Sequence, residues 1–543
     1  MFTPRQITTF NPGIFESRPG SGSQGIFTAV GNLLFFVADD GVSGRELWRS
    51  DGTSSGTIRL SDIWQGTGSS NPYSFAALDS TVYFVARDAS QNGNLWRSDG
   101  TFAGTVQITD FNSSVYSANS VVILDRSVYF LAGSSIGGRL WRSDGTSMGS
   151  VPVSNILSGA SWLTAVGNVL YFPARDSLFG PNVNVELWRS DGTELGTFQV
   201  ADIFPGNRTE ESSEPRRLTA VGETLFFTAE DGVSGFELWK SDGTPTGTAR
   251  VADIHPGSSS SLNGLATGDY SFPTIGRTIF FSANDGVSGY ELWKSDGTQL
   301  GTVRVADINP GPGTSSPSNF TVVDDSIYFT AFDRPGFGPS IWKSDGSSTG
   351  TVLVSRVGAN IAAYNGSDPR YLTAAGKSIY FTAVGNSTTG RELWKTDGTP
   401  SGTVLVADIL PGVDGSDPRD LKVVGNRLFF SAKSPSGNGR QLWALDLEAP
   451  PLTIVRPPSR SSSKINHSFL EVLAKDLVYQ NWNGTPQIWD SQLLNSPYNP
   501  NRYNYQLSRS FGSESLGFFG IGLIADDAPP ILVLRGTGDL LDV

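Results

Sequence analysis

The chain has 543 residues, of which 38% are hydrophobic and 11% aromatic, so its length and composition allow more than one ordinary core. Its formal net charge of −13 disfavours binding to the phosphate backbone of nucleic acids and to anionic lipid surfaces. The absence of cysteine excludes disulfides, thiolate metal sites and cysteine nucleophiles.

The first predicted element is a single strand near the N-terminus, in a stretch without the basic start and apolar run of an ordinary secretory signal. Residues 5–13 match only the last strand of a repeat that then recurs to about residue 448. No stretch approaches 18 consecutive apolar residues, so we expect no membrane span. Pairs of Leu-Trp or Ile-Trp mark the repeat at intervals of 45 to 54 residues, and their tryptophans are Trp48, Trp96, Trp141, Trp188, Trp239, Trp293, Trp342, Trp394 and Trp443.

Each repeat predicts four antiparallel strands, as in residues 218–257. The strands are rich in β-branched and aromatic residues, and the turns between them read Gly-Asn or similar, DGVSG and DGTxxG. Four-stranded units that recur without helical segments indicate an all-β fold, a β-propeller of about nine blades. A solenoid of stacked sheets is the alternative geometry.

The two ends of the repeat region favour the propeller. The ninth unit reaches Trp443 and Asp446 but lacks the DGT turn and the fourth strand, whereas residues 5–13 form a fourth strand without a blade. Exchange of that strand closes a ring and leaves no exposed sheet edge, while a solenoid leaves two. Residues 452–455 offer a second way to complete the last sheet.

The segment around each tryptophan resembles the ELWxxDGT repeats of a bacterial protein family. The octamer is complete at Glu46–Thr53, Glu186–Thr193, Glu237–Thr244, Glu291–Thr298 and Glu392–Thr399. Other units depart from it, with Asn94 and Arg139 in place of the glutamate and Ser340-Ile341 in place of Glu-Leu. The resemblance implies a propeller-like domain of a secreted or cell-surface protein, and the localisation expected here rests on it alone.

Two repeated motifs each allow a functional and a structural interpretation. The tryptophans could stack on sugars, but an aromatic in phase with the repeat is what packing between neighbouring blades requires, so we expect packing. The SDGT element could form part of a calcium loop, but its Asp-Gly pair is typical of a hairpin turn.

The DGVSG loops and the loops after the fourth strands are expected on one face of the ring. That face would gather seven aspartates, a set of oxygen ligands that suits a hard cation such as calcium. The alternative is that each aspartate caps its own turn. The loops after the fourth strands vary most and are where a protein or carbohydrate ligand is expected to bind. His255 and His467 show no metal-ligand spacing. The seven aspartates are Asp40, Asp231, Asp285, Asp202, Asp253, Asp307 and Asp408.

A Pro- and Ser-rich linker is predicted at residues 449–463, and a short α/β segment at 464–543. Within the α/β segment, residues 469–478 have helical apolar spacing, and residues 516–524 and 531–537 are predicted to form two strands. This segment resembles the start of a class 3, fungal-type lipase domain, in which a strand ends in Phe-Arg-Gly-Ser/Thr. The matching residues are Leu534 to Thr537, and the resemblance implies that Thr537 is an oxyanion-hole residue.

A catalytic triad is not complete in this sequence. The stretch Ser513 to Gly517 is a near miss of the Gly-x-Ser-x-Gly elbow, and no histidine follows it. We therefore expect a monomeric, non-catalytic propeller scaffold that needs no cofactor unless calcium binds. The alternatives are a truncated lipase-like hydrolase that carries a propeller, and a lectin-like propeller that binds calcium or carbohydrate.

Overall fold

The computed structural model describes residues 3–10, 13–14, 27–111, 117–134, 137–154, 160–175, 184–206, 211–262, 271–334, 336–357, 367–385, 388–447, 506–513, 518–525 and 528–535. The chain divides into two compact units, Met1–Pro450 and Pro451–Val543. The regular structure of the described residues consists of strands alone. None of them belongs to a helix long and apolar enough to cross a membrane.

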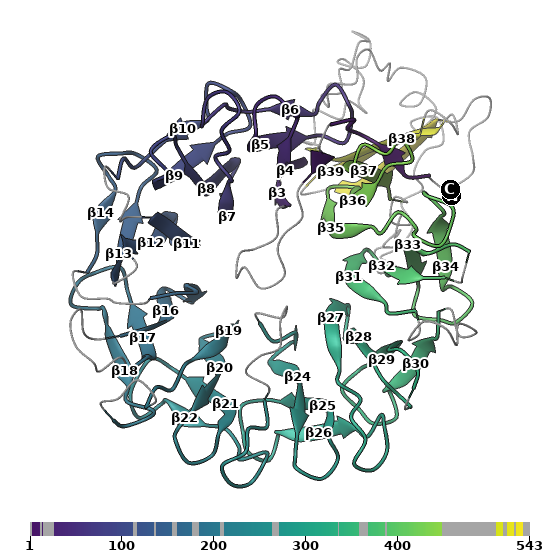
Figure 1. The fold of residues 1–543 in the computed structure, drawn as a ribbon. Coiled ribbons are helices and arrows are strands. Elements are labelled where there is room, and N and C mark those ends of the chain that lie inside the picture. Colours follow the sequence, from purple (N-terminus) through teal and green to yellow (C-terminus); the bar gives the residue numbers. More distant parts are fainter. Residues whose placement is uncertain are drawn as a thin grey trace. The chain divides into compact units, whose positions relative to one another are not determined.

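The first unit is a β-propeller of nine blades, each a sheet of four antiparallel strands (Figure 1). Blades 1 to 3 contain β3 (Thr28–Val30), β4 (Leu33–Asp39), β5 (Arg45–Ser50) and β6 (Ile58–Arg59), then β7 (Tyr73–Leu78), β8 (Thr81–Arg87), β9 (Gly93–Ser98) and β10 (Val106–Gln107), then β11 (Ser117–Leu124), β12 (Ser127–Ser134), β13 (Gly137–Ser143) and β14 (Val151–Pro152). Blades 4 to 6 contain β15 (Thr164–Val166), β16 (Val169–Ala174), β17 (Glu186–Ser190) and β18 (Phe198–Ala201), then β19 (Arg216–Val221), β20 (Thr224–Glu230), β21 (Phe236–Ser241) and β22 (Ala249–Arg250), then β23 (Thr274–Ile275), β24 (Thr278–Asn284), β25 (Tyr290–Ser295) and β26 (Val303–Ala306).

Blades 7 and 8 contain β27 (Ser318–Val323), β28 (Ser326–Ala331), β29 (Ser340–Ser344) and β30 (Val352–Ser355), then β31 (Arg370–Ala375), β32 (Ser378–Val384), β33 (Arg391–Thr396) and β34 (Val404–Ala407). Blade 9 combines β35 (Arg419–Val424), β36 (Arg427–Lys433) and β37 (Arg440–Asp446) with β1 (Arg5–Gln6) from the N-terminus. One further short strand, β2 (Gly13–Ile14), pairs with β4. The prediction of nine four-stranded units in a ring is confirmed.

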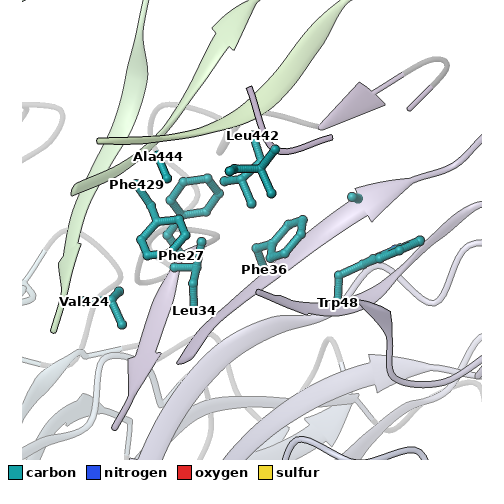
Figure 2. Close-up of a cluster of buried hydrophobic side chains, with 10 residues drawn as sticks. Phe27, Leu34, Phe36, Trp48, Val424, Phe429, Leu442 and Ala444 are labelled. Carbon is teal, nitrogen blue, oxygen red and sulfur yellow. The ribbon is translucent and has the colours of Figure 1, made fainter. Parts of the chain in front are cut away.

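The N-terminal strand closes the ring, as predicted. Gln6 pairs with Trp443 in antiparallel register, and the Ile7 amide donates to the Leu442 carbonyl at 2.7 Å. Residues from blades 9 and 1 pack together at this seam, with Phe429 and Leu442 against Phe36 and its neighbours (Figure 2). Blade 9 therefore has a paired outer edge instead of an exposed one. Residues 452–455, the other candidate for this strand, lie outside the described residues.

The core of the propeller is divided into nine clusters, each shared by two neighbouring blades. Between blades 4 and 5, for example, Tyr171 and Leu187 pack against Leu218 and Phe227. Strand two of every blade is buried on both faces because it lies in the middle of its sheet between two neighbouring blades, which explains its run of apolar residues. Packing between blades therefore provides the core, as is usual for repeat folds.

The residue after the tryptophan links neighbouring blades through the backbone. The Lys240 ammonium donates to the Gly297 carbonyl and the Lys294 ammonium to the Gly346 carbonyl, both at 2.8 Å. Blade 9 has Ala444 at this position, and two other arginines replace the missing donor. Arg5 donates to the Gly52 carbonyl at 3.0 Å, and Arg427 donates to the Asp51 carbonyl. Blades 9 and 1 are thus also joined by hydrogen bonds from basic side chains to backbone carbonyls, but the donors come from other positions.

The second unit contains three described strands in antiparallel order, β38 (Gln506–Ser513), β39 (Phe518–Ala525) and β40 (Ala528–Arg535). β39 and β40 lie where the sequence predicted two strands, and β38 was not predicted. The predicted helix at residues 469–478 and the linker at 449–463 lie outside the described residues. Thr537, the expected oxyanion-hole residue, also lies outside them.

Candidate functional site

Five buried glutamates clamp the chain where one blade passes to the next. In blade 5, Glu237 accepts hydrogen bonds from the backbone amides of Ile254 at 3.1 Å and Ser261 at 3.2 Å, and from the Ser261 hydroxyl at 2.6 Å. Burial raises the pKa of Glu237 to about 7. Blade 9 uses Gln441 instead, whose side-chain oxygen accepts from the Phe10 amide at 2.8 Å. The glutamate clamp comprises Glu46, Glu186, Glu237, Glu291 and Glu392, each fully or almost fully buried.

The nine tryptophans lie between blades, as the packing interpretation predicted. Each belongs to the cluster that its own blade shares with the preceding blade, as Trp188 does with Tyr129 and Leu140 of blade 3. Their indole N–H groups have no hydrogen-bond partner among the described residues. These side chains hold blades together, so they are poorly placed to act as open platforms for sugars.

The DGT turns explain the rest of the repeat motif. In blade 5, Asp242 accepts from the Thr244 amide at 2.9 Å and its hydroxyl at 2.7 Å, and the Gly247 amide donates to that hydroxyl at 3.0 Å. Gly243 has φ of +88°, a conformation that favours glycine. A side chain at Gly247 would meet the Asp242 carboxylate, because a Cβ there would lie 2.0 Å from Oδ1. The motif therefore builds a turn.

The aspartates of the DGVSG loops cap their own turns. Asp231 accepts from the amides of Val233 at 2.9 Å and Ser234 at 2.7 Å, and these bonds, with Arg250, hold its pKa low although burial opposes them. Asp40 and Asp285 make the same pair of backbone contacts. The local turn alternative thus describes how all three are used.

Arginines also separate the predicted cation ligands. Arg250 lies between Asp231 at 3.5 Å and Asp253 at 3.8 Å, and Arg304 bridges Asp285 and Asp307 in blade 6. Within the described part of the chain, no group of three or more His, Asp or Glu side chains is placed to hold a metal ion. The calcium hypothesis stays a prediction. The four aspartates after the fourth strands, Asp202, Asp253, Asp307 and Asp408, are exposed.

The innermost strands carry a feature that the repeat motif does not explain. In seven blades, one residue other than glycine adopts a left-handed conformation at the same point of the chain, four residues before the last residue of the innermost strand, with φ between +48° and +57°. In six of them a register shift, which marks a β-bulge, coincides with it. We call these residues the bulge ring: Ser74, Ser120, Trp162, Arg217, Asn319, Tyr371 and Asp420.

The bulge ring combines one backbone geometry with different side chains. The strands that bear it, such as β7, β19 and β31, are those nearest the centre of the ring (Figure 1). A left-handed conformation costs a residue other than glycine about 1–2 kcal/mol, most readily tolerated by Asn and Asp. Trp162, Arg217 and Tyr371 are not of that kind. Strain of this type persists where the fold or the function requires it, and bulges serve to re-aim side chains.

Some members of the bulge ring also serve the fold. The Ser74 hydroxyl accepts from the Val121 amide of the next blade at 2.8 Å, and Asp420 accepts from the Ser431 hydroxyl at 3.0 Å. Trp162 and Tyr371 are the most exposed, at 45% and 39%. These two large side chains are accordingly the members best placed to contact a ligand.

Blades 8 and 9 add a group of charges beside the bulge ring. Arg391 contacts Asp368 at 2.8 Å, and Asp368 also accepts from Arg370 at 2.5 Å. Asp417 contacts Arg419 at 2.6 Å, Arg391 at 3.9 Å and, more closely, Arg440. We call this the Arg–Asp cluster: Asp368, Arg370, Arg391, Asp417, Arg419 and Arg440.

The Arg–Asp cluster has a buried layer and an outer layer. The side chains of Arg391 and Arg440 are 12% and 7% exposed, whereas Arg370 and Arg419, on the innermost strands, are 54% and 32% exposed. Burial lowers the pKa of Arg391 despite its two aspartate neighbours, and Arg370 adds to that effect. Arg391 is therefore a buried cation held between two aspartates, Asp368 and Asp417.

Sequence reasoning missed both features, although one signal was present. Residues 367–370 and 416–419 both read Ser-Asp-Pro-Arg, and residues 213–216 read Ser-Glu-Pro-Arg. This motif directly precedes the bulge in blades 5, 8 and 9. It falls in the loops after the fourth strands, where binding was expected. Parts of those loops, including residues 207–210 and 263–270, lie outside the described residues.

Comparisons with known proteins concern the fold. No family model and no curated protein matches the chain. Among solved structures, a puromycin hydrolase is 13% identical with a TM-score of 0.38, over 79% of this chain and 60% of that chain. A puromycin-hydrolyzing peptidase of Mycobacterium tuberculosis is 10% identical with a TM-score of 0.37, over 79% and 61%. The β-propeller domain of the Trilobed protease of Pyrococcus furiosus is 9% identical with a TM-score of 0.33, over 74% and 97%.

These matches correct the expected function. The three solved structures are named as a puromycin hydrolase, a puromycin-hydrolyzing peptidase and the propeller domain of a protease, and the expectation of a non-catalytic scaffold is withdrawn. At such identities the likeness is one of fold, and the chain spans about 60% of the length of the first two. The resemblances to ELWxxDGT repeats and to class 3 lipases stay predictions.

Proposed function

We propose that the propeller binds peptides at the bulge ring, as the substrate-binding part of a peptidase-type hydrolase. The observation that carries the proposal is the bulge ring itself, in which one strained backbone position bears six different residue types in seven blades. A rigid scaffold that presents varied side chains at equivalent points is suited to read a ligand of varied chemistry, and a peptide is such a ligand.

The other repeated residues of the blade make structural contacts, which leaves the bulge ring as the candidate binding site. The glutamate clamp, the tryptophans and the DGT turns are all engaged in holding the ring together. Among the described residues, the bulge ring combines exposed aromatic side chains with half-buried amide and charged ones, which match the apolar, polar and ionic groups of a peptide. The peptidase class comes from the names of proteins with the same fold.

Fluorescence anisotropy of labelled peptides with the full chain tests the proposal. Trp162→Ala and Tyr371→Ala each weaken binding by about tenfold, as expected for exposed aromatic contacts. Leu195→Ala is the matched control, because Leu195 is 96% exposed in a DGT turn of blade 4, on the opposite face of the ring. If the control weakens binding as much as the two ring variants, or the ring variants leave it unchanged, the proposal fails.

A further inference from the structure

The glutamate clamp holds the entry to the innermost strand of the following blade. At the junction of blades 6 and 7, Glu291 accepts from the Ser315 amide at 3.2 Å and from the Ser315 hydroxyl at 2.7 Å. The Ser315 carbonyl in turn accepts from the amide of Phe332, directly after β28, at 2.8 Å. Ser315 is therefore tied to blade 6 through its side chain and amide, and to blade 7 through its carbonyl.

Four of the five clamp glutamates precede a member of the bulge ring in this way. Glu46, Glu186 and Glu392 also accept from the amide and the hydroxyl of one serine, at distances of 2.6 to 3.3 Å. The carbonyl of each serine accepts from the amide of the last residue of the second strand of the next blade, at 2.8 to 3.0 Å. The four clamped serines are fully buried: Ser70, Ser213, Ser315 and Ser416.

A short arm of fixed backbone joins each clamped serine to a bulge residue. The sequence of the arm is Ser-x-Pro-x followed by the bulge residue, as in Ser315 to Asn319. Ser316 is left-handed, with φ of +45°, and its amide donates to the carbonyl of Tyr290, the first residue of β25, at 3.0 Å. Pro317 has its own φ fixed by its ring. Little backbone freedom therefore remains between the serine and Asn319.

The clamp of blade 5 lacks this arm. Glu237 holds Ser261 by the same two bonds, at 3.2 and 2.6 Å. The sequence after Ser261 is Leu-Asn-Gly, without the proline, and the described innermost strand of blade 6 begins only at Thr274. No member of the bulge ring lies among the described residues of that blade. The chain thus offers the same clamp with the arm and without it.

We propose that the four glutamates with an arm are positioning residues of the peptide site, each fixing the bulge residue of the next blade through its serine. This inference rests on the proposed peptide-binding function and names the buried groups that set the geometry of its site. Side chains that contact a ligand must be held in place by packed and hydrogen-bonded groups behind them. The glutamates supply that support without touching the ligand, because all four are fully or almost fully buried: Glu46, Glu186, Glu291 and Glu392.

The test measures the affinity of labelled peptides for variants of the full chain at the junction of blades 6 and 7. Glu291→Ala weakens binding by about fivefold, because Asn319 is no longer held in place. Glu291→Gln keeps an acceptor oxygen, as Gln441 does in blade 9, and stays within about twofold of the unaltered affinity. Glu237→Ala is the matched control. It removes the same bonds from the clamp without an arm, so it lowers the unfolding temperature by a similar amount and keeps the affinity.

A double-mutant cycle shows whether Glu291 acts through Asn319. Asn319→Gly removes the side chain, adopts the left-handed backbone without strain and weakens binding by about fivefold. Addition of Glu291→Ala to this variant weakens binding no further. Ser315→Ala and Ser261→Ala form a milder pair for the case that Glu291→Ala does not fold. The first weakens binding by about threefold and the second leaves it unchanged.

The possible outcomes separate the two proposals. Unchanged affinity in Glu291→Ala and Ser315→Ala, with weaker binding in Trp162→Ala, overturns the positioning role and leaves peptide binding intact. Equal weakening by Glu291→Ala and Glu237→Ala, or additive effects of Glu291→Ala and Asn319→Gly, shows a general effect on the fold and also overturns the positioning role. Binding of no labelled peptide by the unaltered chain overturns both proposals.

Discussion

The outer part of each blade and its innermost strand differ in how they use the repeat. In the outer part, the residues that recur make contacts that stabilise the fold: Glu237 accepts hydrogen bonds from backbone amides, Trp239 packs between blades, and Asp242 caps a turn. On the innermost side of seven blades the left-handed backbone conformation recurs, but it carries six different residue types. In this propeller, side chains that are the same in many blades stabilise the fold. The candidate site lies where the backbone conformation is the same but the side chains differ.

Blade 9 departs from the repeat sequence and keeps the same fold. Blade 9 has Gln441 in place of the repeat glutamate and Ala444 in place of the basic residue after the tryptophan, and it takes its fourth strand from the N-terminus, yet it keeps the architecture. Gln441 replaces the clamp, and Arg5 and Arg427 replace the donor between blades. The fold requires the interactions and accepts different residues that supply them.

The largest effect is expected from loss of the N-terminal strand. Deletion of residues 1–10 removes the backbone pairing to β37 and the buried Ile7, which is 5% exposed. The free energy of unfolding should fall by about 5 kcal/mol, from apolar burial of about 2–3 kcal/mol per side chain and hydrogen bonds of about 1 kcal/mol each. Chemical denaturation measures it, and Arg5→Ala is the control, expected to cost about 1 kcal/mol or less. An unchanged unfolding midpoint after the deletion would show that the strand does not close the ring.

Substitution of a repeat tryptophan separates packing from ligand contact. Trp188→Ala should lower the free energy of unfolding by about 3–5 kcal/mol, because it opens a cavity between blades 3 and 4. Trp188→Phe should cost less than half as much, since the indole N–H has no partner among the described residues. Thermal unfolding compares the two. Normal stability of Trp188→Ala together with lost carbohydrate binding would restore the sugar-platform interpretation.

Two glycines with positive φ allow a test of why glycine is required, either for the backbone conformation of the turn or for close contact with the neighbouring blade. Gly192 has φ of +87°, and a Cβ there would lie 2.2 Å from the Tyr129 hydroxyl oxygen of the preceding blade. Gly222 has φ of +60° and no atom within 4 Å of such a Cβ. Gly192→Ala should cost about 2–3 kcal/mol of stability and Gly222→Ala about 1 kcal/mol. Equal losses would mean that backbone strain alone explains the requirement for glycine.

The glutamate clamp predicts a stability that depends on pH. Burial raises the pKa of Glu46, Glu186 and Glu237 to about 7, above the ordinary value of 4.5. Between these values the folded chain holds protons that the unfolded chain has released, so stability should fall as pH rises from about 4.5 to 7.

Glu237→Gln should flatten this pH profile by up to about 3 kcal/mol across that interval, because it removes one of the titrating groups and keeps one of the two acceptor oxygens, as Gln441 does naturally. Denaturation curves measured at a series of pH values provide the comparison. A profile identical to that of the unaltered chain would show that Glu237 does not titrate in this range.

The sequence predicted the features that local chemistry determines. The period of the tryptophans gave nine blades, and the missing fourth strand of the last unit gave the closure by residues 5–10. It could not predict how Asp231 and Asp253 share Arg250, because that contact depends on how neighbouring strands are placed. Nor could it predict the left-handed conformation of Arg217 or Tyr371, since neither residue type favours it and the bulge is imposed by the sheet.

Tyr371→Gly tests the central claim most directly, by measurement of peptide affinity and thermal stability on the same variant. Glycine relieves the strain at φ of +56° and removes the exposed ring. If the bulge ring is kept for binding, the unfolding temperature should stay the same or rise while peptide affinity falls by about tenfold. A lower unfolding temperature with unchanged affinity would show that the ring of strained residues serves the fold alone.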